Sequence, residues 1–189
     1  LLTGYKSNLI KKELKKNFYK KTKIEIISDG KKLLGTGGAI KNAIKKINTK
    51  FFFITYGDTI LDINYEKVFQ KIEKNKKNCL ITIYKNNNLY DKSNIYLKNN
   101  KIIEYSKASK LAKHIDYGLL IFKKKIFTKF YKEKFDLSEI IKYQLLKNDI
   151  IVFVTKKRFY EFGTLDSLRK FRKNFKNNER LNHIINCKK

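Results

Sequence analysis

Residues 51–64, FFFITYGDTILDIN, constrain the fold of this chain more than any other stretch. Phe51 to Ile54 form an unbroken apolar run without helical or alternating periodicity, which is typical of a strand buried on both faces of a parallel sheet. The run gives way to Gly57-Asp58-Thr59, so Asp58 is predicted to follow the carboxyl end of this strand. Open α/β sheets bind their ligands at that end, where the loops diverge.

Asp58 is a candidate ligand for a hard cation such as Mg²⁺. This ion keeps few protein carboxylates and takes its other ligands from water and phosphate oxygens. Gly57 would let the backbone turn tightly just before the carboxylate. An Asp that caps the next helix or forms an Asx turn explains the same pattern equally well. The local sequence leaves both interpretations open.

Length and cysteine content favour one domain in a reducing compartment. A chain of 189 residues can bury the core of a single α/β domain. Residues 1–176 are interpreted as that domain, and the polar residues 177–189 as a tail. No apolar stretch approaches the length of a membrane span, so no membrane partner is expected. Cys79 and Cys187 are too few for a disulfide framework or a metal site, which favours the cytoplasm.

The formal net charge of +28 raises the question of a nucleic-acid partner. Arginine, which is preferred for bidentate contacts with phosphates and bases, is almost absent. The excess is lysine spread along the chain, and Lys, Asn, Ile, Phe and Tyr are abundant while Pro is missing, as A/T-rich codons would favour. A nucleic-acid footprint requires clustered charge, so compositional drift explains the charge better and no specific nucleic acid is predicted.

Strand and helix signals alternate along the chain, which predicts an α/β fold. We expect a Rossmann-like, mostly parallel sheet flanked by helices, with a small β-hairpin insertion whose turn is Asn99-Asn100. Helices are predicted over about 8–18, 35–47, 65–74, 137–146 and from Thr164 onward. Strands are predicted over 1–3, 23–27, 51–54, 79–84, 94–97, 102–105, 115–122, 151–155 and 159–162, the seventh of them interrupted by Asp116-Tyr117-Gly118.

The residues Gly35, Thr36, Gly37 and Gly38 open one of these helices. Glycines at a helix start allow a ligand to approach the backbone, and exposed N–H groups there favour an anionic or polar partner. The segment is not a P-loop, which needs Gly-Lys-Ser/Thr, and Ile40 stands where the dinucleotide fingerprint has its third glycine. A glycine-rich helix start of purely structural use is equally compatible.

Five motifs, in this order, resemble the sugar-phosphate nucleotidyltransferases, or nucleotide-sugar pyrophosphorylases. They are LGTGGAI at 34–40, FFFITYGDTILDIN at 51–64, IIEYSKAS at 102–109, HIDYGLLIF at 114–122 and RFYEFGTLDSL at 158–168. The hairpin and the last two motifs look closest to small single-domain members such as heptose-1-phosphate or mannose-1-phosphate guanylyltransferases. The resemblance implies transfer of a nucleoside monophosphate from a nucleoside triphosphate to a sugar 1-phosphate, giving an NDP-sugar and pyrophosphate. It further implies a role in cell-surface polysaccharide or lipopolysaccharide precursor synthesis.

By this resemblance, Asp58 is the first Mg²⁺ carboxylate. The second is Glu161, at a position where the family usually has an Asp before a Gly-Thr pair. Glu keeps the charge on a longer arm, and an ordinary edge-strand Glu is the alternative. Lys107 takes the place of the family's lysine that contacts the sugar and its phosphate, although Ser106 precedes it where the family has Glu. A solvated surface lysine is the alternative for Lys107.

The resemblance also implies substrate contacts made by small residues. Gly35, Thr36, Gly37, Gly38 and Gly57 match the segments that hold the nucleotide. Asp116 and Gly118 match the segment that reads the sugar hydroxyls. The identity of the nucleotide and of the sugar depends on contacts outside these motifs, and homo-oligomerisation is left open.

One departure from the family pattern concerns the amino terminus. The family's glycine-rich loop ending in Thr-Arg-Leu, followed by a Lys, is absent, and Leu1 to Thr3 have the character of the last residues of a strand. We therefore expect the chain to lack the first strand and signature loop, and to be inactive by itself. A catalytically inactive binding or regulatory module is one alternative function, and the presence of both Asp58 and Glu161 argues against it. A basic nucleic-acid-binding domain is the other alternative, and a salt-dependent DNA-binding assay would discriminate it.

Overall fold

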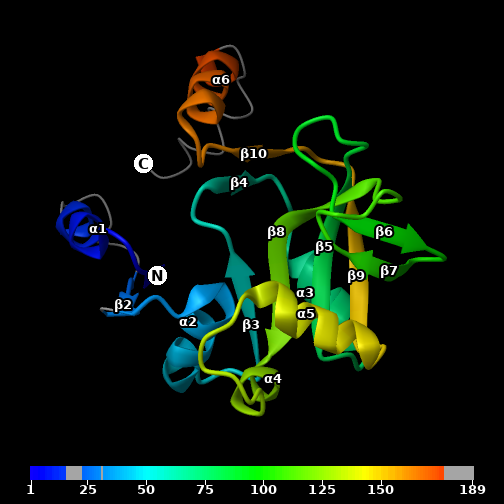
Figure 1. Ribbon diagram of the computed structural model, residues 1–189, viewed down its shortest axis with the longest axis horizontal. Helices are drawn as coiled ribbons and strands as arrows, with labels where there is room; N and C mark the ends of the chain where they lie inside the picture. Colours follow the sequence, from blue (N-terminus) through cyan, green and yellow to red (C-terminus); the bar gives the residue numbers. More distant parts are fainter. Residues whose placement is uncertain (16–22, 31, 177–189) are drawn as a thin grey trace. The chain divides into compact units, whose positions relative to one another are not determined.

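The structure is a computed structural model that describes residues 1–15, 23–30 and 32–176 (Figure 1). It divides into two compact units. The first combines Leu1–Phe52 with Lys123–Asn148, and the second combines Phe53–Phe122 with the residues from Asp149 onward. The predicted polar tail, 177–189, lies outside the described residues, and the interpretation of 1–176 as one domain stays a prediction.

The first unit is mainly helical. A short parallel pair joins β1 (Leu2–Thr3) to β2 (Ile27–Ser28), so the strand expected over 23–27 forms only at its end. The helices are α1 (Ser7–Leu14), α2 (Gly35–Ala43), the 3₁₀ helix Ile44–Lys46, α4 (Lys124–Thr128) and α5 (Leu137–Leu146). The last turn expected for the first helix, 16–18, lies outside the described residues.

Lys41 of α2 holds the chain that leads into α5. Its Nζ donates to the carbonyl oxygens of Phe130 at 2.8 Å and Lys132 at 2.9 Å, and contacts Oε1 of Glu133 at 2.9 Å. The side chain is only 17% exposed, whereas that of Glu133 is 84% exposed. The two carbonyl contacts are therefore the shielded part of the interaction.

Lys41→Met is expected to lower the free energy of unfolding by about 2 kcal/mol, because part-buried carbonyls lose a charged donor. Thermal unfolding measures this loss. Lys45→Met, at an exposed position just after α2, is the control and should change stability little. Equal effects of the two substitutions would contradict a specific role for Lys41.

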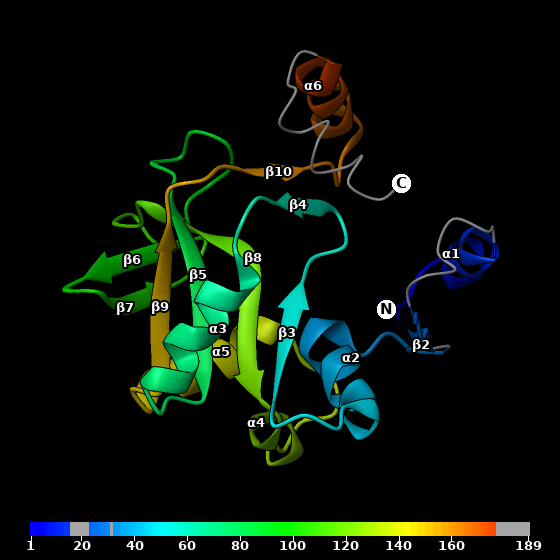
Figure 2. The ribbon, with the colours of Figure 1, turned by 180° about the vertical axis from the view of Figure 1, so that it is seen from behind.

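The second unit is organised around a mixed sheet (Figures 1 and 2). The strand order is β7-β6-β8-β5-β9, and β3 also pairs with β8. The strands are β3 (Phe51–Thr55), β5 (Cys79–Lys85), β6 (Ile95–Lys98), β7 (Lys101–Tyr105), β8 (His114–Lys123) and β9 (Ile150–Thr155). The α/β class and the hairpin are confirmed.

The sheet departs from the mostly parallel arrangement expected from the sequence. β5 runs parallel to β9, but β8 is antiparallel to both β5 and β6, and β6 is antiparallel to β7. A parallel neighbour requires a crossover connection, usually a helix, whereas β5 and β8 are joined through the hairpin β6–β7. The expectation is therefore wrong for the strands around β8.

The core of this unit lies at β5 and β8, not at β3. Residues Cys79 to Ile81 and Leu119 to Phe122 have no exposed surface, and α3 (Tyr65–Lys74) adds the fully buried Val68 and Ile72. In contrast, the side chains of β3 are half-buried or exposed, and Phe53 is 40% exposed. The expected burial of β3 on both faces is thus wrong. Among the described strands β3 pairs only with β8, so it does not have the two strand neighbours of a central strand.

β8 contains a bulge where the sequence predicts an interruption. Ile81 of β5 pairs with Leu120 and Ile83 pairs with Asp116, so the register shifts across Tyr117 to Leu119. Gly118 adopts φ +85°, a conformation that favours glycine. The bulge redirects the chain at the residues expected to contact the sugar.

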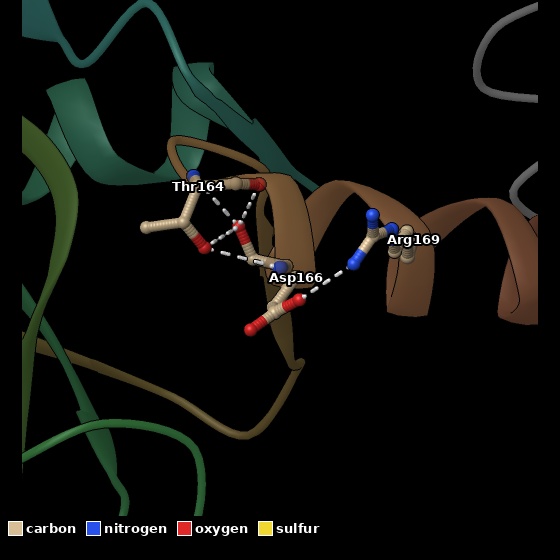
Figure 3. A network of polar contacts seen from close by, with 4 residues as sticks. Thr164, Asp166 and Arg169 are labelled. Carbon is tan, nitrogen blue, oxygen red and sulfur yellow. Dashed lines mark hydrogen bonds and ion pairs between the residues drawn. The ribbon is translucent and has the colours of Figure 1, made fainter.

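A small second sheet and a terminal helix complete this unit. β4 (Thr59–Leu61) is antiparallel to β10 (Phe159–Glu161), and α6 (Leu165–Lys176) follows. The amide of Ser167 donates to Oγ1 of Thr164 at 3.1 Å, and Arg169 pairs with Asp166 at 3.2 Å (Figure 3). Thr164 therefore begins the helix as predicted. The described part of the chain contains no helix with the length and apolarity needed to cross a membrane.

Candidate active site

The antiparallel pair β4–β10 brings Asp58 and Glu161 together. Glu161 is opposite Thr59, the residue after Asp58, and the amide of Phe162 donates to the Asp58 carbonyl oxygen at 2.9 Å. Asp58 follows β3 through a turn, as predicted, and Glu161 ends β10. Two carboxylates that are 103 positions apart in the numbering therefore belong to one site.

Gly163 shows that the two carboxylates face a common point. A β-carbon at this residue would collide with Oδ2 of Asp58 and lie 3.6 Å from Oε1 of Glu161. No other residue type leaves this space free between the two acidic groups. The bare α-carbon therefore maintains a small gap lined by carboxylate oxygens.

The charges around Glu161 suit a cation. Burial raises the pKa of Glu161, the negative charges of Asp58 and Asp91 raise it further, and Lys107 lowers it. A cation between the acidic groups would remove this repulsion. Among the described residues, no group of three or more His, Cys, Asp or Glu side chains is arranged to hold a metal ion. The pair fits Mg²⁺, which needs only one or two protein carboxylates.

Lys107 lies beside this pair and contacts Asp91. Its Nζ is 3.5 Å from Oδ2 of Asp91, and the side chain is 72% exposed. An exposed ion pair of this kind contributes little stability, so Lys107 can exchange Asp91 for an anionic ligand. Asn86 orders the Asp91 loop by donating to the Asp91 carbonyl oxygen at 2.6 Å and to Oγ of Ser93 at 3.1 Å.

The glycine segment at the start of α2 makes hydrogen bonds to the protein's own chain just before α5. The amides of Gly37 and Gly38 donate to the carbonyl oxygen of Phe135 at 3.0 and 3.1 Å, and Oγ1 of Thr36 accepts from the amide of Leu137 at 2.8 Å. The expectation that these N–H groups are exposed is thus wrong. The carbonyl of the chain leading into α5 satisfies them, as the structural alternative requires. A nucleotide contact by this segment stays a prediction.

Gly37→Ala is expected to lower the free energy of unfolding by about 1–3 kcal/mol, a typical cost of overpacking. Its new methyl group would collide with the ring of Phe135. Chemical denaturation measures the change, with Asn42→Ala at an exposed position of α2 as the control. Unchanged stability together with weakened nucleotide binding would instead favour a direct nucleotide contact.

Gly57 differs from the glycines of α2. Its φ does not lie in the left-handed region, so the turn before Asp58 does not require glycine, contrary to the reason inferred from the sequence. A β-carbon at Gly57 would meet no described atom within 4 Å. This open space beside Asp58 is compatible with the predicted nucleotide contact, which stays a prediction.

Asp116 and Gly118 are both buried in the bulge of β8. Oδ2 of Asp116 accepts hydrogen bonds from Tyr105 at 2.8 Å and Tyr56 at 3.2 Å, and Oδ1 accepts from the amide of Gly118 at 2.8 Å. Both carboxylate oxygens are therefore already occupied by protein donors. The predicted contact of Asp116 with the sugar stays a prediction.

Sequence reasoning missed Asp91, Gly163 and Tyr56 as members or neighbours of the site. Tyr56 and Gly163 lie inside two of the quoted motifs, but nothing in the sequence indicates which atoms they contact. Asp91 lies in a loop of asparagines and lysines, where one acidic residue carries no signal. Only the folded chain shows that these residues surround Asp58 and Glu161.

Comparison with known proteins identifies the fold. No protein-family model matches the chain, and no curated protein matches it significantly in sequence. HddC from Yersinia pseudotuberculosis is 25% identical, with a TM-score of 0.73 over 93% of this chain and 77% of HddC. The same protein complexed with GMP-PN aligns with the same TM-score over 91% of this chain and 76% of HddC.

Two more distant structures share the fold alone. One is described as a glucose-1-phosphate thymidylyltransferase from Bacillus anthracis in complex with a sucrose, with 15% identity and a TM-score of 0.73 over 89% of this chain and 72% of the other. The second is the inositol-1-phosphate CTP transferase from T. maritima, with 14% identity and a TM-score of 0.70 over 88% and 70%. The chain thus has a nucleotidyltransferase fold with a pair of carboxylates at its candidate active site. Its motifs and its structure agree on a resemblance to the sugar-phosphate nucleotidyltransferases, and this resemblance is confirmed.

Proposed function

We propose that this protein transfers a nucleoside monophosphate from a nucleoside triphosphate to a sugar 1-phosphate. The observation that carries the proposal is the meeting of Asp58 and Glu161 at Gly163 on this fold. An oxygen of the sugar phosphate attacks the α-phosphorus and forms a new P–O bond. The bond from the α-phosphorus to the bridging oxygen breaks, and pyrophosphate leaves with the electron pair.

This reaction needs charge stabilisation more than proton transfer. The attacking phosphate oxygen is already anionic near neutral pH, so no general base is required, and negative charge concentrates on the phosphates. Asp58 and Glu161 would hold Mg²⁺, which supplies neutralising charge and orients the phosphate oxygens. Lys107, released from Asp91, would direct its ammonium group toward a phosphate.

The comparisons support candidate substrates for the proposal. HddC has been solved with GMP-PN, which makes a guanosine nucleotide the first candidate for this chain. Gly35, Thr36, Gly37, Gly38 and Gly57 are proposed to contact the nucleotide, and Asp116 and Gly118 the sugar. The product would be an NDP-sugar for surface polysaccharide or lipopolysaccharide precursors, made in the cytoplasm, where a free buried cysteine such as Cys79 remains reduced.

Because the chain is expected to be inactive by itself, the proposal is tested on a version that carries the family's amino-terminal strand and glycine-rich loop. Pyrophosphate release from the four ribonucleoside triphosphates and dTTP, each with heptose, mannose or glucose 1-phosphate, is the measurement. We expect one nucleotide and one sugar 1-phosphate to be preferred, and release to require a divalent cation. The NDP-sugar should appear in the same amount as pyrophosphate. Tight binding of nucleotide and sugar phosphate without any pyrophosphate or NDP-sugar would favour the inactive binding module instead.

A further inference from the structure

The buried carboxylate of Asp116 joins a network that reaches the candidate metal site. Asp116 is 9% exposed, and its Oδ2 accepts from the hydroxyls of Tyr56 and Tyr105. Its own amide donates to Oδ1 of Asn94 at 3.0 Å. These contacts favour one orientation of the buried carboxyl group, because rotation would leave its oxygens without their hydrogen-bond donors.

Tyr56 connects this rigid group to Asp58, because it immediately precedes Gly57-Asp58. Gly118, two residues after Asp116 in the bulge, lies against the same turn. A β-carbon at Gly118 would be 3.1 Å from Cδ2 of Tyr56 and 3.8 Å from Cγ2 of Thr59. The residues on both sides of Gly57-Asp58 therefore pack against the bulge of β8.

The side chain of Asp58 has a hydrogen bond within the same turn. Its Oδ1 accepts from Oγ1 of Thr59 at 3.3 Å, a long contact within the same turn. The backbone of residues 56–59 therefore sets the direction of the carboxylate. Tyr56 and Thr59 are the first and last residues of that backbone segment. Both side chains lie close to Gly118, which has no β-carbon to push them away.

We propose that Asp116 and Gly118 are positioning residues that hold the 56–59 turn so that the Asp58 carboxylate faces Glu161. Asp116 fixes the hydroxyl of Tyr56, and the bare α-carbon of Gly118 lets Tyr56 and Thr59 approach β8. This inference rests on the proposed function in one respect, namely that Asp58 and Glu161 together bind a cation. The positioning role differs from a contact with the sugar, because it acts on the metal ligand and not on a substrate.

A positioning role also explains why the carboxylate is buried here. An ionised group is costly to bury, and replacing such a group by packed apolar side chains is often neutral or stabilising. A hydrogen bond to the end of Tyr56 fixes the position of that side chain more narrowly than apolar contact would. Accurate placement of metal ligands by the residues behind them is a general requirement of metal sites.

Two matched substitutions test the proposal. Tyr56→Phe and Tyr105→Phe each remove one hydroxyl from the same oxygen of Asp116, but only Tyr56 belongs to the turn. We expect Tyr56→Phe to weaken Mn²⁺ binding, measured by electron paramagnetic resonance, by about 10-fold. Amide hydrogen exchange at residues 57–59 should become faster in the same variant. Tyr105→Phe should lower the melting temperature about as much as Tyr56→Phe does, but should change Mn²⁺ affinity and exchange at 57–59 much less, because Tyr105 does not belong to the turn.

Steady-state kinetics separate the positioning role from a sugar contact. Loss of turn positioning should lower kcat in Tyr56→Phe with little change in KM for the sugar 1-phosphate. A rise confined to that KM, or equal changes of exchange and Mn²⁺ affinity in the two variants, would overturn the proposal. Absence of transfer activity from a version of the chain that carries the family's amino-terminal strand and glycine-rich loop would refute the proposed function, whereas hydrogen exchange at 57–59 would still decide the positioning role.

Discussion

Asp58→Asn is expected to lower the turnover of nucleotide transfer by about 1,000-fold, the scale on which removal of one electrostatic stabiliser acts. Asn has nearly the same shape and keeps an oxygen that can accept from Thr59. It lacks the charge that would hold a cation against Glu161. The loss should therefore fall on kcat, with the fold intact, and pyrophosphate release under saturating substrates measures it.

The same substitution should change how the stability of the protein depends on pH. Burial and then the charge of Asp58 raise the pKa of Glu161. A carboxyl group whose pKa is raised by folding favours the folded state below its unfolded pKa, and this contribution is lost as pH rises through the folded value. Asp58→Asn removes part of the repulsion. Without divalent cations, raising the pH from below the unfolded pKa of Glu161 to above its folded pKa should therefore lower the melting temperature of the variant less than that of the wild type.

Addition of Mg²⁺ provides the control for both effects. The ion should raise the melting temperature of the wild type near neutral pH by binding only the folded state, and should have little effect on Asp58→Asn. Near wild-type turnover of the variant would contradict the assignment of Asp58 as a cation ligand. An equal response of both proteins to Mg²⁺ would show that the ion binds elsewhere.

Local signals predicted the elements that depend on few distant contacts. The helix expected over 65–74 matches α3 (Tyr65–Lys74), where Asn64 accepts from the amide of Lys67 at 2.9 Å. The helix over 137–146 matches α5 (Leu137–Leu146), which starts with a capping box of Asp136 and Glu139. The hairpin turn is also confirmed, with Asn99 at φ 49° and Asn100 at φ 56°. In each case a short stretch of sequence contains the cause.

The relative directions of the strands and the contact partners of the glycines in α2 were harder to predict. An apolar run such as Cys79 to Ile83 indicates a buried strand but does not say which way its neighbours run. The glycines of α2 similarly indicate a close approach without naming the partner. The structure shows that Phe135 is a partner, since its carbonyl oxygen accepts from both Gly37 and Gly38. Such contacts depend on segments about 100 residues away.

The sequence was sufficient to predict the two carboxylates of the candidate site, but not the contacts of the residues around them. The sequence motifs selected Asp58 and Glu161, and the pairing of β4 with β10 brings them together. The same motifs selected Asp116 and Gly118 as sugar contacts, whereas the structure shows their oxygens and α-carbon against Tyr105 and Tyr56. A motif records which residues a family retains, but it does not distinguish a substrate contact from support for a metal ligand.

Gly163→Ala provides a test of the carboxylate pair that leaves both acidic residues in place. The φ of Gly163 does not lie in the left-handed region, so alanine fits the backbone without strain. Its methyl group would collide with Oδ2 of Asp58 and approach Glu161. We expect the methyl group to displace the short Asp58 side chain and to lower both divalent-cation affinity and turnover by about 10- to 100-fold.

Gly57→Ala is the matched control for this prediction. It adds the same methyl group one residue before Asp58, where no described atom lies within 4 Å. Mn²⁺ affinity and melting temperature should therefore remain those of the wild type in Gly57→Ala, whereas Gly163→Ala should lose affinity at a nearly unchanged melting temperature because Gly163 is exposed. If both variants bind Mn²⁺ as tightly as the wild type, the space between Asp58 and Glu161 does not hold the cation, and the metal ligands must be sought elsewhere in the chain.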